Sequence, residues 1–194
     1  MNKLTRDDLY SLEEYAQVRS EFRTKVMQHK ENRRIPLGEH AALYFEDRLT
    51  MQYQIQEMLR IERIFEPDGI EEELSAYNPL IPDAHNWKAT FMLEYSDVEE
   101  RHTALAELQG IEDKVWVRVN DMDKVYPISN EDLERSNAEK TSAVHFMRFE
   151  LSDEMLIALK KGAEVSMGVE HPGYSVLLED IPEDTRKSLV NDFS

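Results

Sequence analysis

The sequence predicts an α+β protein in which an N-terminal long helical hairpin packs on a C-terminal α+β domain with a mixed or antiparallel sheet. Two observations carry this prediction. Residues 39–66 contain no Gly or Pro and are rich in strong helix formers. After residue 88 the pattern changes to short alternating apolar segments separated by turn residues. We therefore expect a helical hairpin (1–66), a connector (67–87) and an α+β domain (88–194) that form one compact unit.

The first expected helix covers residues 6–31. Thr5 followed by Asp8 resembles a capping box with Asp in place of Glu. Apolar residues then recur at three-to-four spacing, which is typical of an amphipathic helix. This apolar stripe consists of Leu12, Tyr15, Phe22 and Val26.

Several arginines accompany this helix. Arg19 and Arg23 fall beside the apolar stripe, where their stems could pack along its edge with the charged heads in water. In the alternative interpretation, these two cations face Glu46 or Glu57 on the second helix. Arg33-Arg34 lies in the connection between the helices, where we expect a solvated turn.

The second expected helix, residues 39–66, would be roughly 40 Å long. Its apolar residues point to most sides, which predicts a helix enclosed by the fold. A polar row also runs along it at helical spacing: Glu46, Thr50, Tyr53, Glu57 and Arg60. If the helix is enclosed, this row is partly buried and its members need partners. We expect a structural network, a functional pocket or an exposed face.

The second half alternates strands and helices. Residues 70–77 of the connector add a helical turn. Strands are expected at 89–95, 114–119, 125–126, 143–151, 165–169 and 174–178. Helices are expected at 97–108, from Ser129 or Asn130 to about 135, at 152–161 and at 181–193.

Two further residues are candidates for a site in this half. By strand alternation His145 shares a face with apolar residues. It is either a core histidine whose ring is hydrogen-bonded to a carbonyl or carboxylate, or a general base or metal ligand that faces the hairpin. Tyr174 could join a polar cluster. The complete set of ligand or partner candidates is Glu46, Tyr53, Glu57, Arg60, Arg19, Arg23, His145 and Tyr174.

Composition limits the possible chemistry. The 194 residues include no Cys, which excludes disulfides, cysteine nucleophiles and Cys-ligated metal centres. The sequence contains no Gly-rich phosphate loop, GxSxG or HExxH motif. One Glu-x-x-His, from Glu99 to His102, has di-iron spacing, but such sites need two. We therefore expect no metal and no cofactor.

The charge is large and uneven. The formal net charge is −17, and residues 66–194 contain 12 basic and 29 acidic residues whereas residues 1–65 balance. Such a surface keeps the protein soluble or docks it on a basic partner, and it disfavours nucleic acid and anionic membrane. No apolar run approaches 18 residues and the N-terminus lacks a signal-peptide core, so we expect a cytoplasmic protein.

Five segments carry a resemblance to a known family. They are residues 45–62 (FE-R-T-YQ-QEMLR-E), 77–82 (YNPLIP), 89–90 (AT), 143–146 (AVHF) and 171–174 (HPGY). On these residues the chain resembles an uncharacterised bacterial family, the domain of unknown function numbered 3501. The resemblance implies no activity and no catalytic residues. Genes of that family often lie beside genes for rubrerythrin-like and iron–sulfur oxidoreductases, which implies a link to redox or peroxide handling.

These observations lead to two functional hypotheses. The first is a cytosolic accessory or interaction protein of a redox system, without its own redox centre and with a protein as its partner. The second is an enzyme or small-molecule binder that uses the polar row, with arginines holding an anionic ligand. A concave pocket against the row would favour the second hypothesis, and a packed row would favour the first.

Overall fold

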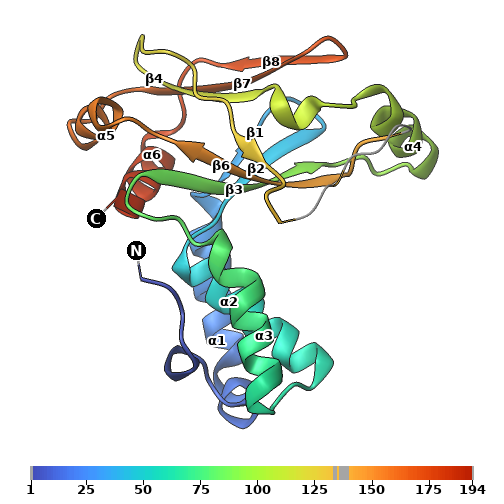
Figure 1. The fold of residues 1–194 in the computed structure, drawn as a ribbon, viewed down its shortest axis with the longest axis vertical. Helices are drawn as coiled ribbons and strands as arrows, with labels where there is room; N and C mark the ends of the chain where they lie inside the picture. Colours follow the sequence, from blue (N-terminus) through green and yellow to red (C-terminus); the bar gives the residue numbers. More distant parts are fainter. Residues whose placement is uncertain (1, 133–134, 136–139, 194) are drawn as a thin grey trace.

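The computed structural model describes residues 2–132, 135 and 140–193. Figure 1 shows a helical arm that extends from a body made of two sheets. The described residues form six α-helices: α1 (Leu12–Glu31), α2 (Arg48–Glu62), α3 (Pro67–Tyr77), α4 (Val98–Glu107), α5 (Asp153–Lys160) and α6 (Glu183–Val190). The arm consists of α1, α2 and α3, and the other helices surround the sheets. The predicted α+β class is confirmed.

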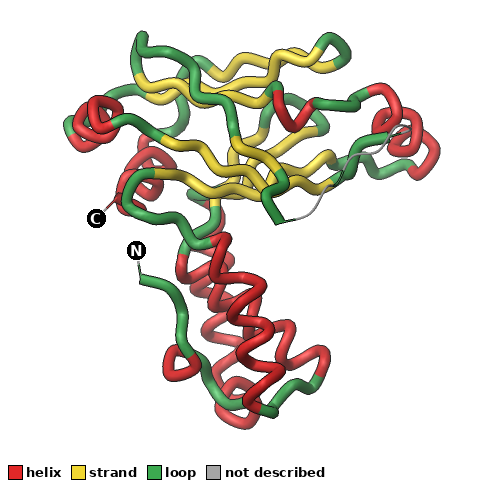
Figure 2. Tube along the Cα trace, viewed as in Figure 1, coloured by secondary structure: helices red, strands yellow, loops and turns green. Residues whose placement is uncertain are grey.

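The body contains two antiparallel sheets, which Figure 2 shows in yellow. Their strands are β1 (Arg34–Pro36), β2 (Ala41–Phe45), β3 (Asn86–Leu93), β4 (Val115–Val119), β5 (Ile128–Ser129), β6 (Val144–Glu150), β7 (Val165–His171) and β8 (Tyr174–Leu178). One sheet has the order β1-β2-β3-β6-β5 and the other the order β4-β7-β8. Every pairing between these strands is antiparallel.

A single apolar core joins the two sheets. Along β4, alternate residues such as Val115 and Val117 are fully buried, and they belong to the same cluster as Phe91 on β3. The C-terminal segment completes this core, because the Trp87 indole N–H donates to the Leu189 carbonyl at 3.0 Å. The arm has its own apolar clusters, built from α1, α2, α3 and the N-terminal segment.

The expected helix over residues 39–66 is wrong in its first part. Ala41–Phe45 is strand β2, which pairs with β1 on one side and β3 on the other. A short apolar run fits a strand buried on both faces as well as a helix, and pairing to two neighbours decides for the strand. The helix begins only at Arg48, where the Asp47 side chain accepts from the Thr50 N–H at 2.9 Å and caps it.

The first helix also begins later than predicted. The Thr5–Asp8 capping box is present, but it caps only the 3₁₀ turn Arg6–Asp8. A second capping box between Ser11 and Glu14 starts α1 at Leu12. The Ser11 cap directly precedes Leu12, the first residue of the apolar stripe, so the continuous helix begins at Leu12.

The connector contains more helix than expected. Instead of one helical turn, residues 67–77 form α3, whose first position is the favourable place for Pro67. This helix returns along the arm, and Asn78 exchanges two hydrogen bonds with the backbone of Leu4. The division into hairpin, connector and α+β domain stays a prediction.

Most elements of the second half lie close to their expected positions, with two exceptions. Val125 forms only an isolated bridge with Val117 rather than a strand. At the expected helix 129–135, Ser129 belongs to β5 and the next three residues are not helical. Residues 133 and 134 of that prediction lie outside the described residues. No helix in the described ranges is long and apolar enough to cross a bilayer.

Candidate functional site

Glu57, on α2, is the centre of the polar row. Its carboxylate accepts from the Tyr15 hydroxyl at 2.7 Å, from Arg19 at 2.8 and 2.9 Å, and from Arg60 at 3.2 Å. The bidentate hydrogen bonds from Arg19 are the main reason why the pKa of Glu57 falls to about 2. Burial and the Glu57 carboxylate raise the pKa of the Tyr15 hydroxyl. Glu57 is therefore ionised at neutral pH, and residues of the arm occupy both of its oxygens.

Glu46 and Tyr53 make no hydrogen bond with Glu57 in the described part of the chain, and each has other neighbours. Glu46 precedes α2, is buried, and accepts from the hydroxyls of Thr50 at 2.6 Å and Thr90 at 2.8 Å. Tyr53 packs against Phe22, with ring centroids 6.2 Å apart. The row thus splits into a carboxylate held at the body and a cluster around Glu57 in the arm.

The two arginines of α1 differ in environment. Arg19 is the partner of Glu57, whereas Arg23 is exposed to solvent. This difference follows from helix geometry, because Arg19 lies one turn from the buried Tyr15 that also reaches Glu57. The structure therefore brings one of these two cations to the row.

His145 is enclosed by residues of the body. Its Nδ1 lies 3.0 Å from the Asn130 amide, and its Nε2 lies 3.0 Å from the Ser142 carbonyl and 2.9 Å from the Thr141 hydroxyl. Burial lowers the pKa of His145, so the ring is neutral near pH 7. These neighbours belong to the body and not to the arm, so the side chain does not face the hairpin.

Tyr174 joins the two sheets. From β8 its hydroxyl donates to the Leu37 carbonyl at 2.6 Å and accepts from the His40 N–H at 3.1 Å. Both partners flank Gly38, which has a φ of +80° and no room for a Cβ, since one would lie 2.6 Å from the Tyr174 oxygen. Tyr174 thus holds the β1–β2 hairpin against the second sheet.

The sequence analysis missed a buried ionic network at the base of the arm. Arg33 is 2% exposed and donates to the carbonyls of Phe45 and Glu46 and to both oxygens of Asp192, at 3.1 and 2.7 Å. Our expectation of a solvated turn is wrong for Arg33, although Arg34 is exposed. No local pattern signals this pairing, because Arg33 and Asp192 are 159 residues apart.

Asp47 and His29 extend this network. Arg33 lies 3.5 Å from the Asp47 carboxylate, and His29 lies 2.5 Å from it. Burial raises the pKa of Asp192 to about 6. Burial also opposes ionisation of Asp47, but the hydrogen bond from His29 and the charge of Arg33 outweigh it and lower the pKa of Asp47. The network binds α1, the start of α2 and the C-terminus together.

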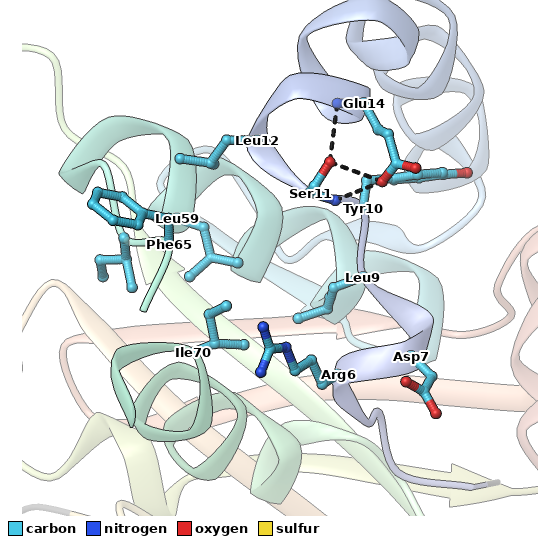
Figure 3. Close-up of a pocket in the computed structure, with 11 residues that line it drawn as sticks. Arg6, Asp7, Leu9, Tyr10, Ser11, Leu12, Glu14, Leu59, Phe65 and Ile70 are labelled. Atoms are coloured by element: carbon cyan, nitrogen blue, oxygen red, sulfur yellow. Dashed lines mark hydrogen bonds between the residues drawn. The ribbon is translucent and has the colours of Figure 1, made fainter. Parts of the chain in front are cut away.

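One cavity of the arm lies away from the polar row. It has a volume of about 320 Å³ and lies near the free end of the arm, between the N-terminal segment and the α2–α3 connection. Figure 3 shows the residues that line it. Its apolar lining consists of Leu9, Leu12, Leu59, Ile64, Phe65 and Ile70. None of the eight candidate residues lines this cavity. Within the described ranges, no group of three or more His, Asp or Glu side chains is arranged to hold a metal ion.

Two residues of the polar row, Glu57 and Arg60, should differ in their contribution to stability. The Arg60 side chain is 41% exposed, so Arg60→Ala should lower the free energy of unfolding by less than about 1 kcal/mol. Glu57→Ala should cost about 1–3 kcal/mol, because it leaves the buried Tyr15 hydroxyl without its acceptor. Urea denaturation of both variants measures this difference. A cost for Arg60→Ala equal to that of Glu57→Ala would contradict the geometry.

The pH dependence of Glu57 has a definite sign. Its folded pKa of about 2 lies below the ordinary value of 4.5. Its contribution to stability is therefore present above pH 4.5 and is lost as the pH falls towards 2. In Glu57→Gln this part of the acid dependence should be missing.

Two comparisons with known proteins gave matches that extend over nearly the whole chain. A sequence model of the family described as "Protein of unknown function (DUF3501)" matches residues 3–193. A crystal structure of a novel protein of unknown function from Burkholderia pseudomallei is 51% identical in sequence, and the match covers 100% of both chains with a TM-score of 0.95. No curated protein matches the chain. Since the family match extends over nearly every residue, the chain belongs to the DUF3501 family, a family of proteins of unknown function.

Proposed function

We propose that this protein is an accessory interaction protein of a redox or peroxide-handling system and that the free end of its helical arm contacts a protein partner. The observation that carries the surface assignment is a pair of large apolar side chains at this end. Ile61 is 60% exposed and Phe65 is 70% exposed. Phe65 also lines the cavity beside Leu59 and Ile64, so its ring belongs to a continuous apolar surface, and such surfaces mark interaction sites. The redox assignment rests on the gene neighbourhood implied by the family resemblance.

The state of the polar row supports a binding role over a reaction at the row. Glu57 is bonded to Tyr15, Arg19 and Arg60, and Glu46 is bonded to two threonines. A ligand would have to displace these partners before it could reach either carboxylate. By the criterion of a packed row, the interaction hypothesis is the better supported one.

The shape of the molecule suits this role. The arm projects from the body, and the connection between α2 and α3 lies at its free end (Figure 1). A partner could bind there without touching the sheets. An aromatic residue that becomes buried in a partner's pocket is the usual centre of such a contact.

Site-specific cross-linking in cells can test the proposal. A photoreactive phenylalanine analogue at position 65 should cross-link an oxidoreductase, which mass spectrometry identifies. The same analogue at position 98 should not, although Val98 on α4 is 61% exposed and gives a matched apolar control. With the recombinant partner, Phe65→Asp should raise the dissociation rate at least about tenfold, and Val98→Asp should leave it unchanged.

Salt should act on a different step of the same association. The excess charge lies in residues 66–194, so higher salt should slow association with a basic partner. Apolar contacts at the arm end should leave the dissociation rate nearly constant. Equal cross-linking at positions 65 and 98, or a partner that carries out no redox chemistry, would refute the assignment.

A further inference from the structure

The cavity near the end of the arm has the character of a ligand site. Its volume of about 320 Å³ lies at the lower end of the range for small-molecule pockets. Six apolar side chains line it, and they come from three segments: the N-terminal segment with the start of α1, the end of α2, and the start of α3 with its preceding loop. The rest of the lining is polar or charged and consists of Arg6, Asp7, Tyr10, Ser11 and Glu14.

Arg6 supplies the positive charge of the cavity lining, which also includes the carboxylates of Asp7 and Glu14. Figure 3 shows its guanidinium between Leu9 and Ile70, on one wall of the cavity. Among the residues that the structure describes, no carboxylate pairs with Arg6. A guanidinium that lies against apolar side chains is a strong partner for a carboxylate, because it presents a planar fork of donors.

The two acidic residues of the lining do not neutralise Arg6. The Glu14 carboxylate accepts from the N–H and the hydroxyl of Ser11, both at 2.9 Å, and so belongs to the cap of α1. Hydrogen bonds from Ser11 lower the pKa of Glu14, which keeps it in that role. Asp7 lies on the opposite side of the 3₁₀ turn and points away from Arg6 (Figure 3).

We propose that this cavity binds a small amphipathic carboxylate, with its hydrocarbon tail among the apolar side chains and its carboxylate on Arg6. The volume fits a short acyl chain, and the single unpaired cation selects a monoanion. This inference goes beyond the proposed interaction role, because it concerns the isolated protein and needs no partner.

Three ligands with the same tail separate charge recognition from apolar binding. Octanoate, octanol and octylamine are titrated into the purified full-length chain, and methyl NMR shifts are followed. Shifts should localise to Leu9, Leu12, Ile64 and Ile70, with the exposed Ile157 of α5 as a control for non-specific association. Octanoate should bind at least about tenfold more tightly than octanol, and octylamine more weakly than octanol.

Charge reversal gives the decisive comparison. Arg6→Glu should invert the preference, so that octylamine binds more tightly than octanoate. Arg23→Glu makes the same change of charge on an exposed part of the arm outside the cavity, and should leave octanoate binding unchanged. Leu12→Trp should fill the cavity and abolish binding of all three ligands without lowering the melting temperature.

Three results would overturn the proposal. These are equal affinity for octanoate and octanol, an unchanged order of affinities in Arg6→Glu, and uniform shifts that include Ile157. If Leu12→Trp does not fold, the Arg6→Glu comparison still decides. Loss of partner cross-linking at position 65 with intact octanoate binding would reject the interaction role alone.

Discussion

Arg33→Met is expected to lower the free energy of unfolding by about 3–5 kcal/mol. The substitution keeps much of the side-chain volume but removes the only cation that donates to both oxygens of Asp192 within the described network. Asp192 is then a buried carboxylate that has lost the Arg33 guanidinium, and the backbone carbonyls of Phe45, Glu46 and Ser188 lose a donor. Chemical denaturation followed by circular dichroism measures this change.

The neighbouring arginine provides a matched control. Arg34 lies on the surface, where it pairs with Glu94 at 2.9 Å and Tyr44 at 2.8 Å. Arg34→Met should therefore cost less than about 1 kcal/mol. Similar losses for the two substitutions would show that the buried network contributes no more than a surface ion pair.

The pH dependence of the Arg33→Met effect follows from Asp192. Its folded pKa of about 6 exceeds the ordinary value of 3.8, so its favourable contribution is complete below about pH 4 and is lost as the pH rises through 6. Without Arg33 that pKa moves still higher. The loss of stability on substitution should then be larger at pH 7.5 than at pH 5. His29 and Asp47 are present in both the wild-type protein and the variant, so they do not distinguish the two proteins. A loss independent of pH would contradict an uncompensated carboxylate.

Trp87→Ala should also cost about 3–5 kcal/mol, because it empties a large volume where the first sheet meets the C-terminal segment. The indole is fully buried, and its ring centroid lies 5.9 Å from that of Phe45 and 5.4 Å from that of Phe193. Its N–H also holds the Leu189 carbonyl of α6. The C-terminal helix should therefore lose protection from hydrogen exchange in this variant.

Two further variants separate the hydrogen-bonding and packing contributions to the cost of Trp87→Ala. Trp87→Phe keeps an apolar ring but removes the indole donor of the Leu189 carbonyl, which retains only the Asn191 N–H among the described residues, so about 1–3 kcal/mol should be lost. Leu177→Ala, on the exposed face of β8, should change stability by less than about 0.5 kcal/mol. If Trp87→Ala costs no more than Leu177→Ala, the indole does not hold the C-terminal segment to the sheet.

Part of the fold is predictable because its signals are local. Asp97 begins α4 and Ser152 begins α5, since each side chain accepts from a backbone N–H three residues later. Alternating valines along β4 mark a strand in the same local way. The pairing of Glu57 with Arg60 follows from i,i+3 spacing on one helix.

Other features of the fold cannot be recognised from a short stretch of sequence. The apolar run at 41–45 fits either a strand or a helix, and only its two neighbouring strands decide. The arm cavity likewise needs three segments to meet before it exists.

The α+β class, the caps of several helices and the family can be predicted from the sequence alone, because each depends on residues close together in the chain. The strand inside the expected long helix, the burial of Arg33 and the cavity beside Arg6 appear only in the folded protein. These depend on contacts between residues far apart in the chain, such as Arg33 and Asp192. The free energy of such contacts comes from burial and pairing in the folded state, so it cannot be predicted from the local helix or strand propensity of the residues.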